Sequence, residues 1–332
     1  LSAKFDIIPL FNGKITISSV QLFGFNINLN KPAPHMEPNF KFVLDAFASK
    51  DTVKTKKDID LRINSILIRR GKLSYDVLSE EETPGKFNPQ HIKLHNIIAN
   101  ISLKALQNDS INAAIKRLSV DEQSGFELRK LSLKVIANNK GMKIENFAIE
   151  MPGTEMKMDT IRMEYDSLKA LNHFADNVRF SFRTLPSHVT LNDISAFVPA
   201  LSNFKEKLDL NIDVEGTLNQ LNCRTLEINA GDKFRLKGDV SLQDLSRPQD
   251  AYVYGHLANL SANKEGIGFL VRNLSPHYNG VPPVLQHLGN TSFHGEISGY
   301  FTDLVMYGLF RTDIGSVQTD LKLSSDKAKA LF

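Results

Sequence analysis

The chain repeats one pattern of apolar positions seven times. Two apolar residues stand two positions apart, a step of three follows, and two more apolar residues again stand two apart. Alternation with a period of two places side chains on one face of a strand, whereas a step of three would turn the later side chains to the other face. A β-bulge absorbs the extra residue, keeps the apolar side chains on one face and bends the strand. The seven sets are Ile15, Ile17, Val20 and Leu22; Leu61, Ile63, Ile66 and Ile68; Ile92, Leu94, Ile97 and Ala99; Phe126, Leu128, Leu131 and Leu133; Met142, Ile144, Phe147 and Ile149; Met156, Met158, Ile161 and Met163; and Leu221, Cys223, Leu226 and Ile228.

The spacing of these sets predicts antiparallel hairpins. The sets that begin at Phe126, Met142 and Met156 follow one another at the length of one strand plus a turn. Turn-forming residues lie between them, at 138–141 and 151–154. We expect further strands at 208–214, 234–242, 252–257, 290–301, 305–312 and 316–323.

Helical signals are few and short. They predict helices at 40–47, 192–201, 262–274 and 284–288. The polar segments 49–58 and 78–89 are expected to be solvated loops. The predicted fold class is therefore mainly β, an elongated, curled antiparallel β-sheet that forms a groove with a hydrophobic interior, with a few short helices.

The domain prediction is one continuous β-groove segment of a longer protein over residues 1–332. The alternative is a division into 1–167 and 187–332. The chain begins at Leu1 without a Met and stops at Phe332 without a polar tail, so we expect a membrane anchor or a further domain outside it.

Three architectures fit repeated strands of this kind. In a closed sandwich the apolar face would be ordinary core. A parallel β-helix would stack similar sets at a regular spacing, and the sets here begin at irregular intervals. An open, curled antiparallel sheet would leave an apolar inner face, and apolar patches of that extent mark binding surfaces.

Composition limits the classes of function. The chain has 40 basic and 37 acidic residues, so its formal net charge of +3 gives no strong field that would attract nucleic acid. The single cysteine, Cys223, lies at an apolar position and cannot form an internal disulfide. Tryptophan is absent, which argues against the aromatic platforms of a glycan-active protein.

Residue patterns typical of catalysis are not found in the sequence. A Gly-x-Ser-x-Gly nucleophile motif is absent, and Gly266 and Gly268 lack the third glycine of a phosphate-binding loop. His91 and His95 have a spacing that a metal site uses on a helix, but their surroundings predict a strand. We therefore predict no enzyme activity, no cofactor and no metal.

An elongated apolar groove would suit an acyl chain. Each methylene group kept from water contributes about 0.8 kcal/mol, so exposing a long chain to water costs on the order of 10 kcal/mol. A continuous apolar trough removes that barrier without any catalytic group.

Several stretches resemble a known family. The stretches are 13–30 (GKITISSVQLFGFNINLN), 61–75 (LRINSILIRRGKLSY), 124–135 (SGFELRKLSLKV), 189–201 (VTLNDISAFVPAL), 291–299 (TSFHGEISG) and 308–315 (GLFRTDIG). They resemble the AsmA-like and TamB proteins of Gram-negative bacteria, in particular the large versions found in Bacteroidetes. These motifs describe an architecture, and they contain no catalytic signature to transfer.

The resemblance implies a β-taco that is tethered to the inner membrane by a preceding helix and crosses the periplasm. Family members are linked to phospholipid transport between the two membranes and to the assembly of outer-membrane proteins with a β-barrel partner. We therefore expect a periplasmic conduit for phospholipid acyl chains. Its groove residues are expected to be those of the sets that begin at Ile15, Leu61, Phe126, Met142 and Met156.

A second hypothesis is a scaffold that templates a strand of an outer-membrane protein along an exposed sheet edge. Edge backbone groups would then matter more than groove side chains.

Overall fold

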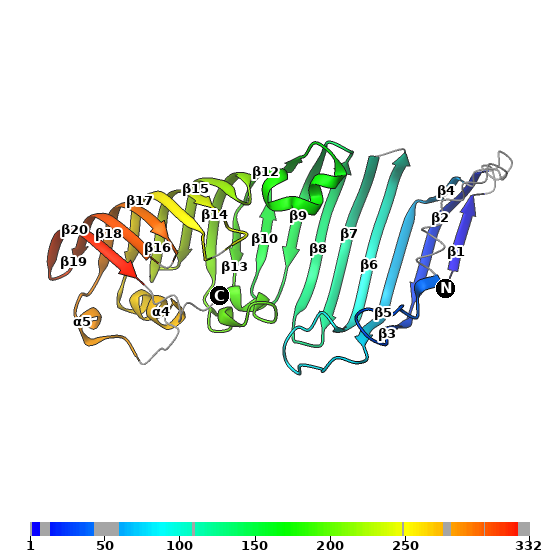
Figure 1. Cartoon of the computed structure of the whole chain (residues 1–332), viewed down its shortest axis with the longest axis horizontal. Coiled ribbons are helices and arrows are strands. Elements are labelled where there is room, and N and C mark those ends of the chain that lie inside the picture. Colours follow the sequence, from blue (N-terminus) through cyan, green and yellow to red (C-terminus); the bar gives the residue numbers. More distant parts are fainter. Residues whose placement is uncertain are drawn as a thin grey trace. The chain divides into compact units, whose positions relative to one another are not determined.

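The computed structural model describes residues 2–6, 14–42, 60–107, 110–247, 249–274, 280–301 and 303–324. The fold is mainly β, as the sequence predicts. Its strands form one curved, mainly antiparallel sheet with a few short helices (Figure 1). The expected loop at 49–58 and positions 43–47 of the expected helix at 40–47 lie outside the described residues. Within the described part of the chain, no helix has the length and apolarity of a membrane span.

After residue 207 the strands match the expected ones closely. The strands of the whole sheet are β1 (Ser2–Asp6), β2 (Lys14–Phe23), β3 (Asn26–Lys31), β4 (Asp60–Ile63), β5 (Ser65–Val77), β6 (His91–Gln107), β7 (Ser110–Glu122), β8 (Glu127–Ala137), β9 (Gly141–Glu150), β10 (Glu155–Met158), β11 (Ile161–Glu164), β12 (Arg179–Arg183), β13 (Ser187–Val189), β14 (Leu208–Thr217), β15 (Gln220–Ala230), β16 (Phe234–Gln243), β17 (Tyr252–Ala262), β18 (Thr291–Tyr300), β19 (Asp303–Thr312) and β20 (Gly315–Ser324).

The expected helix at 262–274 is confirmed, and the region 192–201 forms two short 3-10 turns instead of one helix. The helical elements are η1 (Leu168–His173), α3 (Phe174–Asn177), η2 (Leu191–Ile194), η3 (Pro199–Leu201), α4 (Lys264–Leu274) and α5 (Pro283–Gln286). The predicted loop at 78–89 lies between β5 and β6.

Contacts group the chain into two units, which are described separately. Unit 1 consists of Leu1–Val135, Ile149–Pro152 and Asp193–Pro199. Unit 2 consists of Ile136–Ala148, Gly153–Asn192 and Ala200–Phe332.

In unit 1 the first strands depart from the antiparallel expectation. β2 runs parallel to β4 and β5, and β3 runs parallel to β5. Antiparallel strands can be joined by a tight hairpin, whereas parallel strands need a connection of a dozen or more residues. The segment 32–59 between β3 and β4 provides that length.

The parallel pairing aligns two copies of the apolar pattern position by position. The opposed pairs are Ile15 with Leu61, Ile17 with Ile63, Val20 with Ile66, and Leu22 with Ile68. The alignment continues across β6 and β7 in two rows, which are Val20, Ile66, Ile101 and Ile115, and Leu22, Ile68, Ala99 and Leu118. Unit 1 therefore presents one continuous apolar face.

In six of the seven sets the three-residue step coincides with an irregularity in the strands. The pairing register shifts at the step in the sets that begin at Ile15, Ile92 and Leu221. In β6 and β9 the step contains a left-handed residue, Asn96 with a φ of 54° and Asn146 with a φ of 55°. In the sets that begin at Leu61 and Met156 the strand is interrupted at the step, so each set is divided between two strands. The predicted bulges are thus present where the register shifts, whereas these two sets have a break in the strand instead.

Two further strands have the same bulged pattern. In β7 the apolar positions are Ala113, Ile115, Leu118 and Val120, with a register shift opposite Ile101. In β17 they are Gly255, Leu257, Leu260 and Ala262, with a register shift between the middle two.

The apolar face of unit 2 is organised in cross-strand rows. Row A, near one end of the strands, consists of Met142, Met163, Phe180, Gly216, Leu221, Leu242, Val253, Gly299 and Leu304. Row B, near the other end, consists of Leu210, Ile228, Leu236, Leu260, Phe293 and Phe310.

Glycines between these rows allow close approach of neighbouring strands. A Cβ atom at Gly238 would overlap the carbonyl oxygen of His256, and one at Gly295 would overlap that of Tyr307. Both glycines lie opposite Leu257 on the apolar face. Larger residues would therefore require the backbone to shift.

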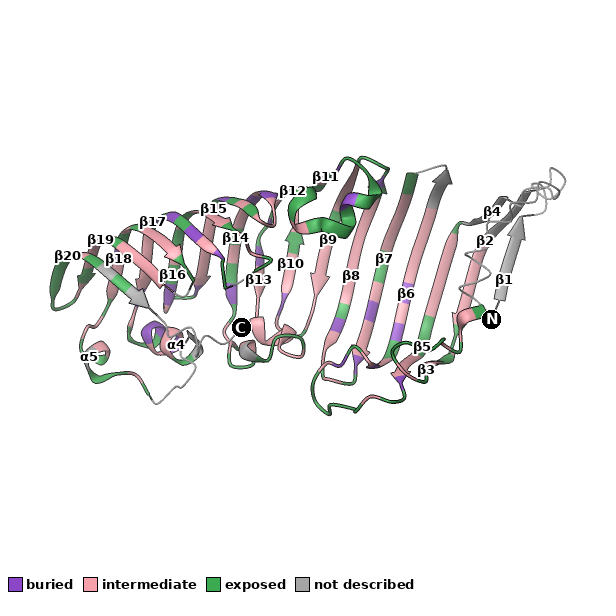
Figure 2. Ribbon diagram, viewed as in Figure 1, coloured by how far each residue is buried: buried purple, intermediate pink, exposed green. Residues whose placement is uncertain are grey.

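Few of the described residues are fully buried. Most strand residues are intermediate in burial, and the fully buried residues form short bands in many of the strands and in α4 (Figure 2).

Candidate apolar binding face

The predicted groove residues are mostly half-buried. Of those whose side chains are described, Leu128 and Ile161 are buried, with exposed fractions of 7% and 8%, and the others are intermediate. The side chains of the other four positions, at 15, 17, 61 and 63, lie outside the described residues. Half-burial is the state expected of an apolar face that a second layer does not fully cover.

One margin of this face in unit 2 is closed by α4. Phe269 of α4 is 4% exposed, and its ring centroid lies 5.8 Å from that of Phe204 and 6.5 Å from that of Phe234. Ile267 is buried in the same cluster, which includes the strand residues Leu208, Ala230 and Ala262. Residues of row B and of α5 pack around this cluster, and no residue of row A belongs to it.

The start of α4 is fixed to the strands beneath it. The side-chain oxygen of Asn263 accepts the N–H of Gly266 at 2.9 Å, which caps the helix. The backbone N–H of Asn263 donates to the carbonyl of Lys233 at 3.0 Å. A Cβ atom at Gly266 would overlap that same carbonyl, so the helix lies directly against the turn between β15 and β16.

A second cluster lies beside the other end of the strands. Tyr165, Ala170 and Val178 are buried there, and Met142 and Met163 of row A pack against them. The Tyr165 hydroxyl donates to the carbonyl of Asn138 at 2.9 Å, which fastens the segment after β11 to the turn before β9.

A polar basin adjoins this second cluster, where β9, β11, β12 and β14 begin or end. Its volume is about 1080 Å³. The lining residues are Lys140, Glu164, Tyr165, Asp166, Ser167, Lys169, Ala170, His173, Asp176, Asn177, Arg179 and Thr217. The basin thus contains both cations and carboxylates. Its strand residues Glu164, Arg179 and Thr217 are neighbours of Met163, Phe180 and Gly216 of row A, so they point to the opposite face of the sheet.

In unit 1 an aromatic cluster packs beside the start of β8. The ring of Phe197 lies 4.7 Å from that of Phe87 and 4.9 Å from that of Phe126, measured between centroids. The Phe87 N–H also donates to the carbonyl of Ala196 at 3.3 Å. Phe126, a predicted groove residue, therefore has an aromatic neighbour that the sequence pattern did not indicate.

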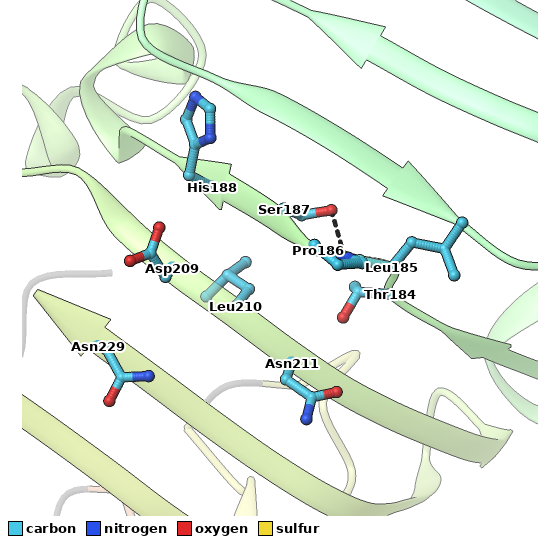
Figure 3. A pocket seen from close by; sticks show the side chains of 9 residues that line it. All are labelled: Thr184, Leu185, Pro186, Ser187, His188, Asp209, Leu210, Asn211 and Asn229. Carbon is cyan, nitrogen blue, oxygen red and sulfur yellow. Dashed lines mark hydrogen bonds between the residues drawn. The ribbon is translucent and has the colours of Figure 1, made fainter.

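A smaller cavity of about 530 Å³ lies beside β13 and β14 and brings Ser187, His188 and Asp209 near one another (Figure 3). Ser187 and His188 are consecutive in a strand, so their side chains point to opposite faces. The Ser187 hydroxyl donates to the carbonyl of Leu185 at 2.7 Å and accepts the N–H of Lys157 at 2.9 Å. These residues therefore do not form a nucleophile–base pair.

His91 and His95, the pair considered for a metal, have different partners. His91 is 4% exposed, and its Nδ1 lies 3.0 Å from a carboxylate oxygen of Asp76 and its Nε2 2.9 Å from the carbonyl of Glu80. The Nε2 atom of His95 lies 3.9 Å from the Oδ2 atom of Asp121.

Asp76, Glu82 and His91 are nevertheless close enough to be a candidate metal cluster. Lys93 already places its ammonium 2.9 Å from a Glu82 oxygen, and both ring nitrogens of His91 are engaged. The hydrogen bond with Asp76 raises the pKa of His91, against the opposing effect of burial. The arrangement is a hydrogen-bonded ion cluster that holds the loop after β5.

Comparisons with protein families, curated proteins and solved structures give no match. The resemblance to AsmA-like and TamB proteins therefore rests on the sequence stretches given above.

Proposed function

We propose that the protein binds phospholipid acyl chains on its apolar face and acts as a lipid conduit in the periplasm, between the inner and outer membranes of a Gram-negative bacterium. The supporting observation is the set of continuous apolar rows that cross neighbouring strands in each unit, in which most residues are half-buried. The AsmA-like and TamB resemblance supports the cellular setting. In that setting an anchor outside this chain would tether it to the inner membrane.

The physical basis is the transfer of apolar surface out of water. An acyl chain on the rows would shield both its own methylene groups and the half-exposed side chains beneath it, and each buried methylene group contributes about 0.8 kcal/mol. The face is non-directional along a row, so binding at one position does not prevent movement to the next.

The test is lipid analysis of the detergent-free protein together with a matched pair of variants. Leu242 is a half-buried member of row A, and Gln243 is its exposed neighbour on the opposite face. Leu242→Glu should greatly reduce the phospholipid that co-purifies, while Gln243→Glu should retain it. Lipid-free wild-type protein would contradict the proposal, and so would equal lipid in both variants.

A second candidate function is a scaffold for assembly of an outer-membrane protein with a β-barrel partner. The supporting observation is β20, which among the described strands pairs with β19 alone. Its other edge could add a strand of a client. The N–H groups of the consecutive residues Gln318 and Thr319 point to opposite edges of β20, so proline at one of them removes an N–H from the edge that faces β19 and proline at the other removes one from the open edge. Under this function, the proline variant that alters the open edge should reduce client assembly more than Leu242→Glu does.

A further inference from the structure

The side of the sheet opposite the apolar rows, here called the polar face, has a feature of its own in unit 2. One cross-strand row on it runs from β16 to β19 and consists of Gln243, Tyr252, Tyr300 and Asp303. Each of these residues is next in sequence to a member of row A, so its side chain points to the opposite face of the sheet. The row therefore faces away from the surface proposed to bind lipid.

A cavity of about 800 Å³ lies against this row. The turn between β16 and β17 provides the rest of its lining, which is Asp244, Arg247, Gln249 and Asp250. The guanidinium of Arg247 lies 2.7 Å from a carboxylate oxygen of Asp244 and 3.6 Å from one of Asp250. The backbone N–H of Arg247 also donates to the carbonyl of Asp244 at 2.8 Å. The turn thus holds its polar groups beside the row, around a volume typical of small-ligand sites.

Aromatic side chains gather on the same face. Four of the chain's seven tyrosines lie on the polar face of β17, β18 and β19, and they are Tyr252, Tyr254, Tyr300 and Tyr307. The rings of Tyr252 and Tyr300 meet edge to face, with centroids 5.3 Å apart, and Tyr300 is still 51% exposed. Tyr254 and Tyr307 are 52% and 58% exposed. Exposed groups of this kind that lie together mark binding surfaces.

The groups around the cavity match those of a sugar ring. A pyranose has a face of C–H groups and a rim of hydroxyls, and each hydroxyl both donates and accepts hydrogen bonds. The exposed ring of Tyr300 suits the C–H face. The amides of Gln243 and Gln249 donate and accept, the guanidinium of Arg247 donates, and the carboxylates accept. The lining therefore offers both partners of a hydroxyl beside an aromatic surface.

The charges of the lining disfavour ionic ligands. Its three carboxylates outnumber its one guanidinium, so a phosphate would be repelled. The carboxylates also have cationic partners already. Arg247 lies between Asp244 and Asp250, and the ammonium of Lys322 lies 3.2 Å from a carboxylate oxygen of Asp303. The site thus does not require a cationic ligand either, and a neutral polyhydroxyl compound fits it best.

From this cavity and its tyrosines we infer that the polar face of unit 2 binds a neutral oligosaccharide, with one sugar ring stacked on Tyr300 and hydroxyls bonded to Gln243 and Gln249. Tyr254 and Tyr307 extend the aromatic surface, because each step of two residues along a strand adds about 7 Å. The absence of tryptophan argued against such a platform, but the fold assembles one from tyrosines that are distant in the sequence. This site is independent of the proposed lipid function.

The test measures binding of four neutral tetrasaccharides to the whole chain by saturation-transfer NMR and calorimetry. The probes are cellotetraose, chitotetraose, maltotetraose and mannotetraose. At least one should bind, with the strongest saturation at the C–H protons of one ring face. Binding of none of the four would overturn the inference. Displacement of the bound sugar by tetramethylammonium would show an aromatic cation site and would overturn it as well.

Variants of Tyr300 test the stacked ring. Tyr300→Ala should lower the affinity for the bound tetrasaccharide by about tenfold, whereas Tyr300→Phe, which keeps the ring, should retain it within about threefold. Phe23→Ala is the matched control, because it removes a ring of 47% exposure from unit 1, and it should have no effect. Equal losses in the two Tyr300 variants, or no loss in Tyr300→Ala, would contradict the inference.

A second pair of variants tests the polar lining. Gln249→Ala removes an exposed amide of the turn and should lower the affinity by about fivefold. Gln318→Ala removes an exposed amide of β20 that does not line the cavity, and it should leave the affinity unchanged. A loss in Gln318→Ala alone, or in neither variant, would refute the assignment of the site.

Lipid analysis separates this site from the proposed function. Tyr300→Ala should leave the phospholipid that co-purifies unchanged, because Tyr300 points away from the apolar rows. Joint loss of lipid and sugar in this variant would overturn a separate sugar site. A lipid-free wild-type chain that still binds a tetrasaccharide would contradict the lipid conduit and support the present inference.

Discussion

Val20 in β2 lies directly opposite Ile66 in β5, in a parallel pairing. The three-residue step of each pattern precedes these residues, so the two irregular strands keep the same register on both sides of the step. A shift of one residue would turn one set of apolar side chains to the polar face. The matched steps therefore fix the register of unit 1 where the pairing is parallel.

The left-handed residue in β9 gives a test of the bulge. Asn146 is exposed and has a φ of 55°, which β-branched residues adopt at high cost. We expect Asn146→Val to lower the free energy of unfolding by about 1–2 kcal/mol. Asn146→Gly should change it by only a few tenths. Urea unfolding measures both, and an equal loss in the two variants would contradict a bulge that depends on this conformation.

The buried histidine predicts a pH dependence. The hydrogen bond with Asp76 raises the pKa of His91 above its ordinary value of 6.5. The stabilisation is therefore fully present below pH 6.5 and is lost as the pH rises through the raised pKa. The protection factors of amide hydrogen exchange in β5 and β6, which are corrected for the intrinsic rise of exchange with pH, should fall over that window in the wild type and stay level in His91→Gln.

His95, which is half-exposed beside Asp121, provides the control. His95→Gln should leave the pH dependence of exchange unchanged. An NMR titration of His91 with a midpoint below 6.5 would contradict the assignment.

The three-residue step made the bulges predictable, because side chains in any strand alternate between the two faces. A step of three keeps the apolar side chains on one face only if a bulge absorbs the extra residue. It could not reveal whether Ile15 pairs with Leu61 in a parallel or an antiparallel strand, since both arrangements fit the same pattern. The repeat of the apolar pattern in β17 was not recognised in the sequence, because its first position is Gly255 and glycine was not counted as an apolar residue. The helix at α4 was predictable, but its position over row B depends on contacts of Phe269 with Phe204 and Phe234 that only the folded chain brings together.

The α4 cluster should dominate the stability of its surroundings. Phe269→Ala removes a ring that is 4% exposed and should lower the free energy of unfolding by about 3–5 kcal/mol. Phe301→Ala is the matched control, because that ring is 37% exposed, and it should cost much less. Thermal and urea unfolding measure both. Similar losses in the two variants would show that α4 does not pack as described.

The single cysteine should react slowly in the folded protein. Cys223 is 5% exposed on the apolar face, and its thiol donates to the carbonyl of Thr225 at 3.0 Å. Burial raises the pKa of the thiol, so less of the reactive thiolate is present at a given pH. Labelling by a thiol reagent at pH 8 should therefore become fast only when urea unfolds the chain.

Asn222 is the exposed neighbour on the opposite face, so Asn222→Cys combined with Cys223→Ser should label rapidly without urea. Equal rates for the two cysteines in the folded protein would contradict the orientation of β15, and with it the assignment of Leu221 and Leu226 to the apolar face.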